Sequence, residues 1–179
     1  EYNSLTSVIG TDNEKEQGGF DLDDHRIKYG LIGFHGLVDE HGAEDTNLKT
    51  EDIEQLDSAC WRAIKNQTIT RSKVGQEPRL YVRVEYDTDS FHIGGLTHEL
   101  DVVGDDEDAR SYRTVQDVTV DATDLVSRLK SHEDRIQTVH VVADDALDIA
   151  LDGETFDDGF VSALEDRFES VNEIDVYDH

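Results

Sequence analysis

The 179-residue chain carries 43 Asp and Glu against 16 Lys and Arg, which gives a formal net charge of −27. Apolar residues make up 36% of it, enough for one domain with its own core, and no stretch approaches the length of a membrane span. The single cysteine excludes an internal disulfide and favours a reducing cytoplasm. We find no signal peptide, and because the chain starts at Glu1 and contains no Met, we expect it to be a piece of a longer protein.

The acidic residues are spread over nearly every segment, and Lys is scarcer than Arg, with six against ten. Such a surface keeps a protein hydrated and dispersed in concentrated salt, where the Debye length falls to about 3 Å at 1 M and self-repulsion is screened. The charge therefore favours adaptation to high salt. The alternative is an acidic protein that repels nucleic acid or mimics it.

In the first third of the chain, residues 1–25 read as a strand followed by a loop, and residues 26–38 as a strand that contains three glycines. A polar loop is expected over 39–49. Residues 50–67 are the clearest helix, with Thr50 as its cap. Its apolar residues fall on one stripe at helical spacing: Ile53, Leu56, Cys60, Ala63 and Ile64. We therefore predict that Cys60 is a packed thiol and that the neighbouring Trp61 is a core anchor.

The next strand is predicted over residues 79–86, after Pro78. Its residues alternate, so that one face is apolar and the other is basic and aromatic. The apolar set is Leu80, Val82, Val84 and Tyr86, and the outer set is Arg79, Tyr81, Arg83 and Glu85. This pattern predicts a half-buried strand.

The rest of the chain mixes short strands and helices. Strands are predicted over 91–100 (with a turn), 115–120, 136–142 and 171–177. An acidic loop is predicted over 104–110. Helices are predicted over 121–132 and around the apolar stripe Phe156, Phe160, Leu164 and Phe168. In the first of these helices Leu125, Val126 and Leu129 should face inward, whereas residues 144–153 show no decisive pattern. The predicted class is α+β, of ferredoxin-like character.

The segment from Arg62 to Arg83 departs from the charge of the whole chain. It holds six basic residues against a single acid, Glu77. Hydroxyl and amide side chains in its central loop are groups that bind phosphate oxygens. The segment therefore predicts a nucleic-acid surface, unless its bases pair with the acidic remainder or with a partner protein.

Other candidate sites have weaker patterns. His35 and His41, like His92 and His98, lack the spacing of a metal motif, and there is no cysteine pair, so we expect no metal and no cofactor. The acidic runs at 105–108 and 144–145 are expected to be solvated loops.

Several stretches resemble the family-seven CRISPR-associated proteins of subtype I-B, the repeated backbone subunit of the Cascade surveillance complex. These stretches are residues 28–38 (KYGLIGFHGLV), 61–66 (WRAIKN), 69–80 (ITRSKVGQEPRL) and 82–86 (VRVEY), preceded by QGGF at 17–20. The likeness is strongest over 69–86, runs from about residue 17 to about residue 100, and continues weakly to the end.

The resemblance implies a partial RRM-like, ferredoxin-type RNA-binding core over 1–103, with a C-terminal α/β extension over 104–179 packed on it. The family's N-terminal half would be missing. The implied function is a cytoplasmic, non-catalytic antiviral subunit that grips CRISPR RNA in a multi-copy filament. Its partners would be other copies of itself, other Cascade subunits and, indirectly, target DNA, with no membrane. The predicted RNA-binding residues are Lys65, Asn66, Thr70, Arg71, Ser72, Lys73, Gln76, Arg79 and Arg83.

Two other functions stay open. An acidic protein-interaction module would need no RNA contact. An endoribonuclease of the same superfamily would need a histidine placed with other acid–base groups near glycines, for which His35, between Gly33 and Gly36, is the only candidate.

Overall fold

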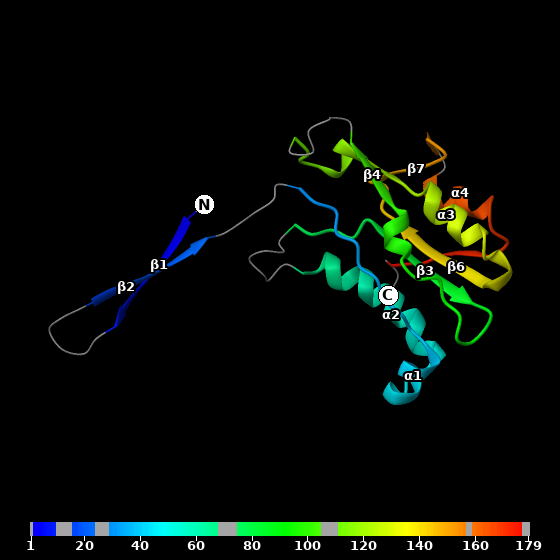
Figure 1. Ribbon diagram of the computed structural model, residues 1–179, viewed down its shortest axis with the longest axis horizontal. Coiled ribbons are helices and arrows are strands. Elements are labelled where there is room, and N and C mark those ends of the chain that lie inside the picture. Colours follow the sequence, from blue (N-terminus) through cyan, green and yellow to red (C-terminus); the bar gives the residue numbers. More distant parts are fainter. Residues whose placement is uncertain are drawn as a thin grey trace. The chain divides into compact units, whose positions relative to one another are not determined.

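The computed structural model describes residues 2–9, 16–23, 29–67, 75–104, 111–156 and 159–176. The chain divides into two units, residues 1–31 and residues 32–179. In the first unit, β1 (Tyr2–Ile9) and β2 (Glu16–Asp23) pair as an antiparallel hairpin (Figure 1). The expectation of a single strand followed by a loop was therefore wrong, because residues 16–23 form a second strand.

The second unit contains a three-stranded sheet, ordered β3-β6-β9. β3 (Leu80–Tyr86) pairs antiparallel with the central strand β6 (Ile136–Ala143), and β9 (Val171–Glu173) pairs parallel with β6 on its other side. The predicted strands over 79–86 and 136–142 are confirmed. Within the described residues the last strand is shorter than predicted.

A second sheet is ordered β4-β5-β7-β8. Its strands are β4 (Asp101–Gly104), β5 (Val118–Asp121), β7 (Asp148–Leu151) and β8 (Glu154–Thr155). Asp152 and Gly153, both at positive φ, make the two-residue turn that joins β7 to β8. Sequence patterning missed β4, β7 and β8, and placed a strand at 91–100 where the chain forms loop and a 3₁₀ turn (Leu96–Glu99).

Four α-helices occur among the described residues: α1 (Glu40–Thr46), α2 (Thr50–Lys65), α3 (Thr123–Lys130) and α4 (Gly159–Glu165). α1 replaces part of the predicted 39–49 loop, because the Asp39 carboxylate accepts a hydrogen bond from the Gly42 amide and caps a helical turn. In α2 the capping contact is made by Asp52, which accepts from the Lys49 amide at 2.8 Å, so Thr50 is the first helical residue rather than the cap.

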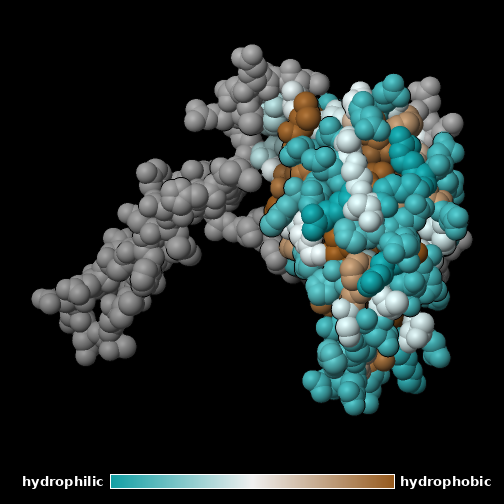
Figure 2. Space-filling view, turned by 45° about the vertical axis from the view of Figure 1, so that its right-hand side comes forward, coloured by the Kyte–Doolittle hydropathy of each residue, from teal (hydrophilic) through white to brown (hydrophobic). Residues whose placement is uncertain are grey.

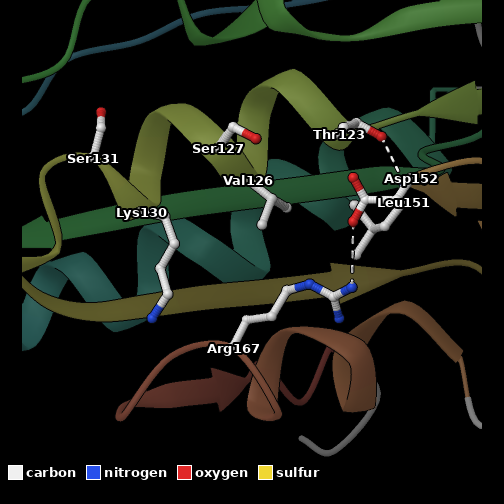
Figure 3. Close-up of a pocket in the computed structure, with 8 residues that line it drawn as sticks. All are labelled: Thr123, Val126, Ser127, Lys130, Ser131, Leu151, Asp152 and Arg167. Carbon is white, nitrogen blue, oxygen red and sulfur yellow. Dashed lines mark hydrogen bonds and ion pairs between the residues drawn. The ribbon is translucent and has the colours of Figure 1, made fainter.

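The main core lies between the β3-β6-β9 sheet, α3 and α4, and strands β5 and β7 of the second sheet contribute to it. Its most deeply buried side chains are Leu129, Leu151, Leu164, Val118, Val139 and Val141. α2 covers the opposite face of the same sheet, where Trp61, Val142 and Val176 form a smaller apolar cluster with Tyr81 and Ile174. Figure 3 shows this layering, with α3 in front of the strands and α2 behind them.

The α+β class is confirmed. The predicted boundary between residues 103 and 104 falls inside β4, and both sheets of the second unit join strands from the two sides of it. The inward residues of α3 are buried as predicted. The predicted stripe of α2 was wrong, since Leu56 and Ala63 are exposed and the buried positions are Asp57, Ser58 and Trp61.

The segment before α1 is the other departure from the predicted elements. Residues 29–39 form no strand, although the pattern over 26–38 predicts one. A strand needs a hydrogen-bonded neighbour, and among the described residues none lies beside this segment.

Candidate nucleic-acid interface

The basic segment connects α2 to β3. Lys65 is the last residue of α2, and the Asn66 amide donates to the Arg62 carbonyl at 2.8 Å, closing the helix end. Gln76 and Arg79 precede β3, and Arg83 lies within it. The other four predicted residues, Thr70, Arg71, Ser72 and Lys73, lie outside the described residues.

Arg83 is held by a buried carboxylate. Asp57 of α2, only 3% exposed, accepts hydrogen bonds from Arg83 Nε at 2.8 Å and from Nη2 at 2.9 Å. Two parallel bonds of this kind form the strongest geometry available to an arginine–carboxylate pair. Burial acts to lower the pKa of Arg83, but the hydrogen bonds and charge of Asp57 outweigh it, so the pKa is raised and the pair stays ionised.

Tyr81 shares the same carboxylate. Its hydroxyl donates to Asp57 Oδ1 at 2.8 Å, while its ring packs in the cluster around Trp61. Burial raises the pKa of the Tyr81 phenol, and the bond to Asp57 raises it further. The strand face that the sequence presents as an outer basic face is therefore covered by α2.

Arg79 is also paired. Its Nη1 donates to Asp144 at 2.5 Å, and its Nη2 pairs with Glu77. Asp144, expected in a solvated loop, is thus tied to the start of β3. For Arg79 and Arg83 the structure realises the alternative in which basic residues of the segment pair with the chain's own acids.

Two of the remaining polar residues that the structure describes in this segment face solvent. Lys65 and Asn66 are exposed, and Gln76 and Arg62 are partly exposed. The structure places Lys65 and Asn66 together at one end of α2. Their amine and amide groups are donors of the type that binds phosphate oxygens.

A further polar group extends the covered face and was missed by sequence reasoning. His140 Nε2 lies 2.9 Å from Glu85 Oε2, and Asn172 Nδ2 lies 3.0 Å from His140 Nδ1. Because His140 is opposite Arg83 in the β3–β6 register, the alternation of β6 would have been the signal that places it on this face.

Among the described residues, the structure adds no metal site and no reactive group at the other candidate sites. His35 is exposed and makes no hydrogen bond or ion pair among the described residues, and His41 lies 3.8 Å from Glu40. Within the described ranges no three His, Cys, Asp or Glu side chains come together as a metal site. The Cys60 thiol, expected in the core, is only partly buried, and burial and the Asp57 charge raise its pKa, so the reactive thiolate is disfavoured.

A second basic pair lines a pocket of about 500 Å³ beside α3 (Figure 3). Lys130 lies 2.6 Å from Glu133, and Arg167 donates to the Ala163 carbonyl at the end of α4 and lies 3.8 Å from Asp152. Arg167 thus satisfies a carbonyl near the end of α4, and each cation lies beside an acid. The pocket does not extend the candidate interface, which lies with α2 and β3.

Among the described helices, none is both long and apolar enough to cross a bilayer. The family model described as CRISPR-associated protein Cas7 matches residues 1–123 of the chain. A protein of Haloferax volcanii named CRISPR-associated protein Cas7 is 56% identical over 177 residues. That alignment covers 98% of this chain and 52% of the relative, so the chain spans about half the relative's length.

Proposed function

Because the chain belongs to the Cas7 family of CRISPR-associated proteins, we propose that it acts as a non-catalytic subunit that binds CRISPR RNA along its phosphate backbone. Its place would be a cytoplasmic, multi-copy type I-B Cascade filament, with a ferredoxin-like core contributing the RNA surface. The single observation that carries this proposal is the basic segment 62–83, which keeps six cations against one acid in a chain of charge −27.

Within that segment we assign different roles to different residues. Lys65, Asn66 and Gln76 would donate to phosphate oxygens directly, together with Thr70, Arg71, Ser72 and Lys73. Arg79 and Arg83 direct their donors to carboxylates, so a phosphate would have to compete with those acids. Their first role is to fix α2 and the start of β3, and any RNA contact they make would be secondary.

The test is guide-RNA retention by the assembled complex that carries variant subunits. We expect Lys65→Glu, and more strongly Arg71→Glu with Lys73→Glu, to weaken retention for every guide sequence. The slope of log affinity against log salt should fall by about one unit for each phosphate that the variant no longer neutralises. Unchanged retention in the double variant would contradict the assignment.

A matched control lies on the same helix. Lys49→Glu makes the same charge change at the opposite end of α2, outside the basic segment. It should leave retention close to the wild-type value. If Lys49→Glu and Lys65→Glu weaken retention equally, the effect is one of net charge, and the segment is not the interface.

A further inference from the structure

The pocket beside α3 brings two basic side chains together with apolar ones. On the face drawn in Figure 2 most of the described surface is hydrophilic, and hydrophobic residues are confined to patches. The pocket, of about 500 Å³, is lined by the buried side chains of Val126 and Leu151 and by two cations, Lys130 and Arg167. A hollow of this size, with apolar side chains and a few polar groups in its lining, is the usual form of a small-molecule site.

The two cations come from different elements. Lys130 is the last residue of α3, and Arg167 follows α4. Figure 3 shows both side chains extending into the space between these two helices. In a chain that carries 16 basic residues against 43 acids, two cations that line one pocket offer a place for a negatively charged ligand.

Arg167 is held in place without using most of its donors. Its Nη1 donates to the Ala163 carbonyl at 2.9 Å, and its guanidinium lies 5.5 Å from the centre of the Phe156 ring. Its Nη2 is 3.8 Å from the Asp152 carboxylate, which is too long for a hydrogen bond. Arg83 differs, because its Nε and Nη2 both donate to one buried carboxylate, at 2.8 and 2.9 Å. The contacts of Arg167 therefore fix its position and leave its Nε and Nη2 able to donate to an anion.

Each cation has an acid beside it that an anionic ligand would have to displace. The Asp152 side chain, 3.8 Å from Arg167, is 75% exposed. Lys130 pairs with Glu133 at 2.6 Å, and these two side chains are 42% and 40% exposed. Exposed ion pairs contribute little free energy, so a ligand with two negative charges and several oxygens can compete with both. The Asp152 carboxylate indicates where the ligand's anionic group would lie.

We propose that this pocket binds a small phosphate monoester, with the phosphate between Lys130 and Arg167 and the organic part against Val126 and Leu151. A monoester carries a charge of about −1.5 to −2 at pH 7 and three acceptor oxygens, which suit two cations. The Thr123 hydroxyl accepts a backbone amide at 2.7 Å and can donate its own hydrogen to the same ligand. An internal phosphate of a nucleic acid carries a single charge and continues as chain on both sides, so it suits the pocket less well. The inference does not use the basic segment and is independent of RNA binding.

The experiment titrates the chain with phenyl phosphate by calorimetry in about 2 M KCl, where repulsion is screened and chloride competes for unspecific cations. We expect saturable binding of one ligand per chain, with a dissociation constant of about 1 mM or lower. Inorganic phosphate, which has no apolar part, should bind more weakly, and dimethyl phosphate, which has a single charge, should bind most weakly. No saturation by phenyl phosphate up to about 20 mM, or equal binding of the three ligands, would overturn the proposal. Lys65→Glu, which tests RNA binding, should leave this titration unchanged, so the two proposals fail separately.

A first pair of variants tests the cation. Arg167→Gln removes the guanidinium and should weaken the binding of phenyl phosphate about 10-fold or more. Arg128→Gln makes the same charge change on α3, at a residue outside the pocket lining that pairs with Glu99, and should change affinity less than about 2-fold. Equal effects of the two variants would overturn the proposal.

A second pair tests the competing acid and removes no packed side chain, so it decides the matter even where Arg167→Gln fails to fold. Asp152→Asn removes the carboxylate and should strengthen binding about 3-fold, while Asn tolerates the φ of 55° at this turn position. Asp148→Asn makes the same charge change at an exposed position outside the pocket lining and should change affinity less than about 2-fold. Binding that is unchanged or weaker in Asp152→Asn, or strengthened equally by both variants, would overturn the proposal.

Discussion

α2 covers one face of the β3-β6-β9 sheet largely through charged and hydrogen-bonded side chains, whereas α3 and α4 cover the other face with apolar ones. On the α2 face the central contact is Asp57 with Arg83 and Tyr81, beside the small cluster around Trp61. On the other face Leu129 and Leu164, each 1% exposed, pack against a sheet whose Val139 and Val141 are fully buried.

The difference separates two tasks within one domain. Apolar burial is non-directional and supplies most of the stability, while the bidentate Asp57–Arg83 pair fixes one position of α2 along β3. A buried ion pair adds little net free energy, because the cost of desolvation offsets the attraction, but removing one partner leaves an uncompensated charge. The α2 face should therefore be the more sensitive to single substitutions and the more tolerant of concerted ones.

The largest expected effect comes from breaking the ionic face. Asp57→Ala leaves Arg83 and Tyr81 without their acceptor and should lower the free energy of unfolding by about 4 kcal/mol. Denaturant titration in concentrated KCl measures it. Replacing the three residues together, with Asp57→Leu, Arg83→Met and Tyr81→Phe, should restore most of that stability. If the triple variant is less stable than Asp57→Ala, the ion pair adds net stability to the fold and does not only fix the position of α2 along β3.

On the apolar face, Leu129→Ala removes a side chain that is 1% exposed and should cost about 3 kcal/mol through reduced burial and the cavity left behind. Val103→Ala, at a position that is 56% exposed, is the matched control and should change stability by less than about 0.5 kcal/mol. Charged substitutions around Leu129 should not restore the stability that Leu129→Ala loses, whereas the triple replacement on the α2 face should restore most of the stability lost there. Similar destabilisation by the two alanine variants would remove the basis of the comparison.

A smaller effect is expected at Trp61, where the two kinds of chemistry meet. Its ring is 2% exposed, and its Nε1 is a buried donor that has no hydrogen-bond partner among the described residues. Trp61→Phe reduces the packing but also removes that unsatisfied donor, so the net cost should be about 1 kcal/mol. Thermal unfolding of Trp61→Phe beside Trp61→Leu separates the ring's packing from its N–H group. A cost for Trp61→Phe as large as that for Trp61→Leu would show that the donor has a partner.

The smallest effect is a pH dependence from Tyr81 on the α2 face. The raised pKa of Tyr81 means that the folded state holds its proton more tightly than the unfolded chain, whose tyrosines titrate near about 10. This contribution to stability is complete below that pH and is lost as pH rises above it. Ultraviolet titration should show a late component, to which Tyr86 also contributes because burial raises its pKa, and Tyr81→Phe should reduce that component by one tyrosine. A wild-type titration without a late component would contradict the assigned hydrogen bond.

Patterning in the sequence predicted the elements whose periodicity is strong. The strand over 79–86, the helix over 50–67 and the inward side of α3 were all correct in type, but the predicted exposed face of the strand is covered by α2. The 148–155 hairpin was missed although Asp152-Gly153 is a recognised turn pair, so that signal was present in the sequence. The buried face of α2 was misjudged because a helix that packs on polar strand residues buries Asp57 and leaves Leu56 exposed, which reverses the usual apolar rule.

The sequence by itself determined the acidic character, the basic segment, the α+β class and the family, because composition, periodicity and motif order are local properties of the chain. Only the tertiary structure decided that Arg83 meets Asp57, 26 positions away, that Arg79 meets Asp144, and that Ile32–Val38 has no strand beside it among the described residues. Each of these depends on which distant segments come together. The arrangement of these distant segments is the one that minimises the free energy of the whole fold, so it cannot be predicted from the residues that neighbour each segment in the sequence.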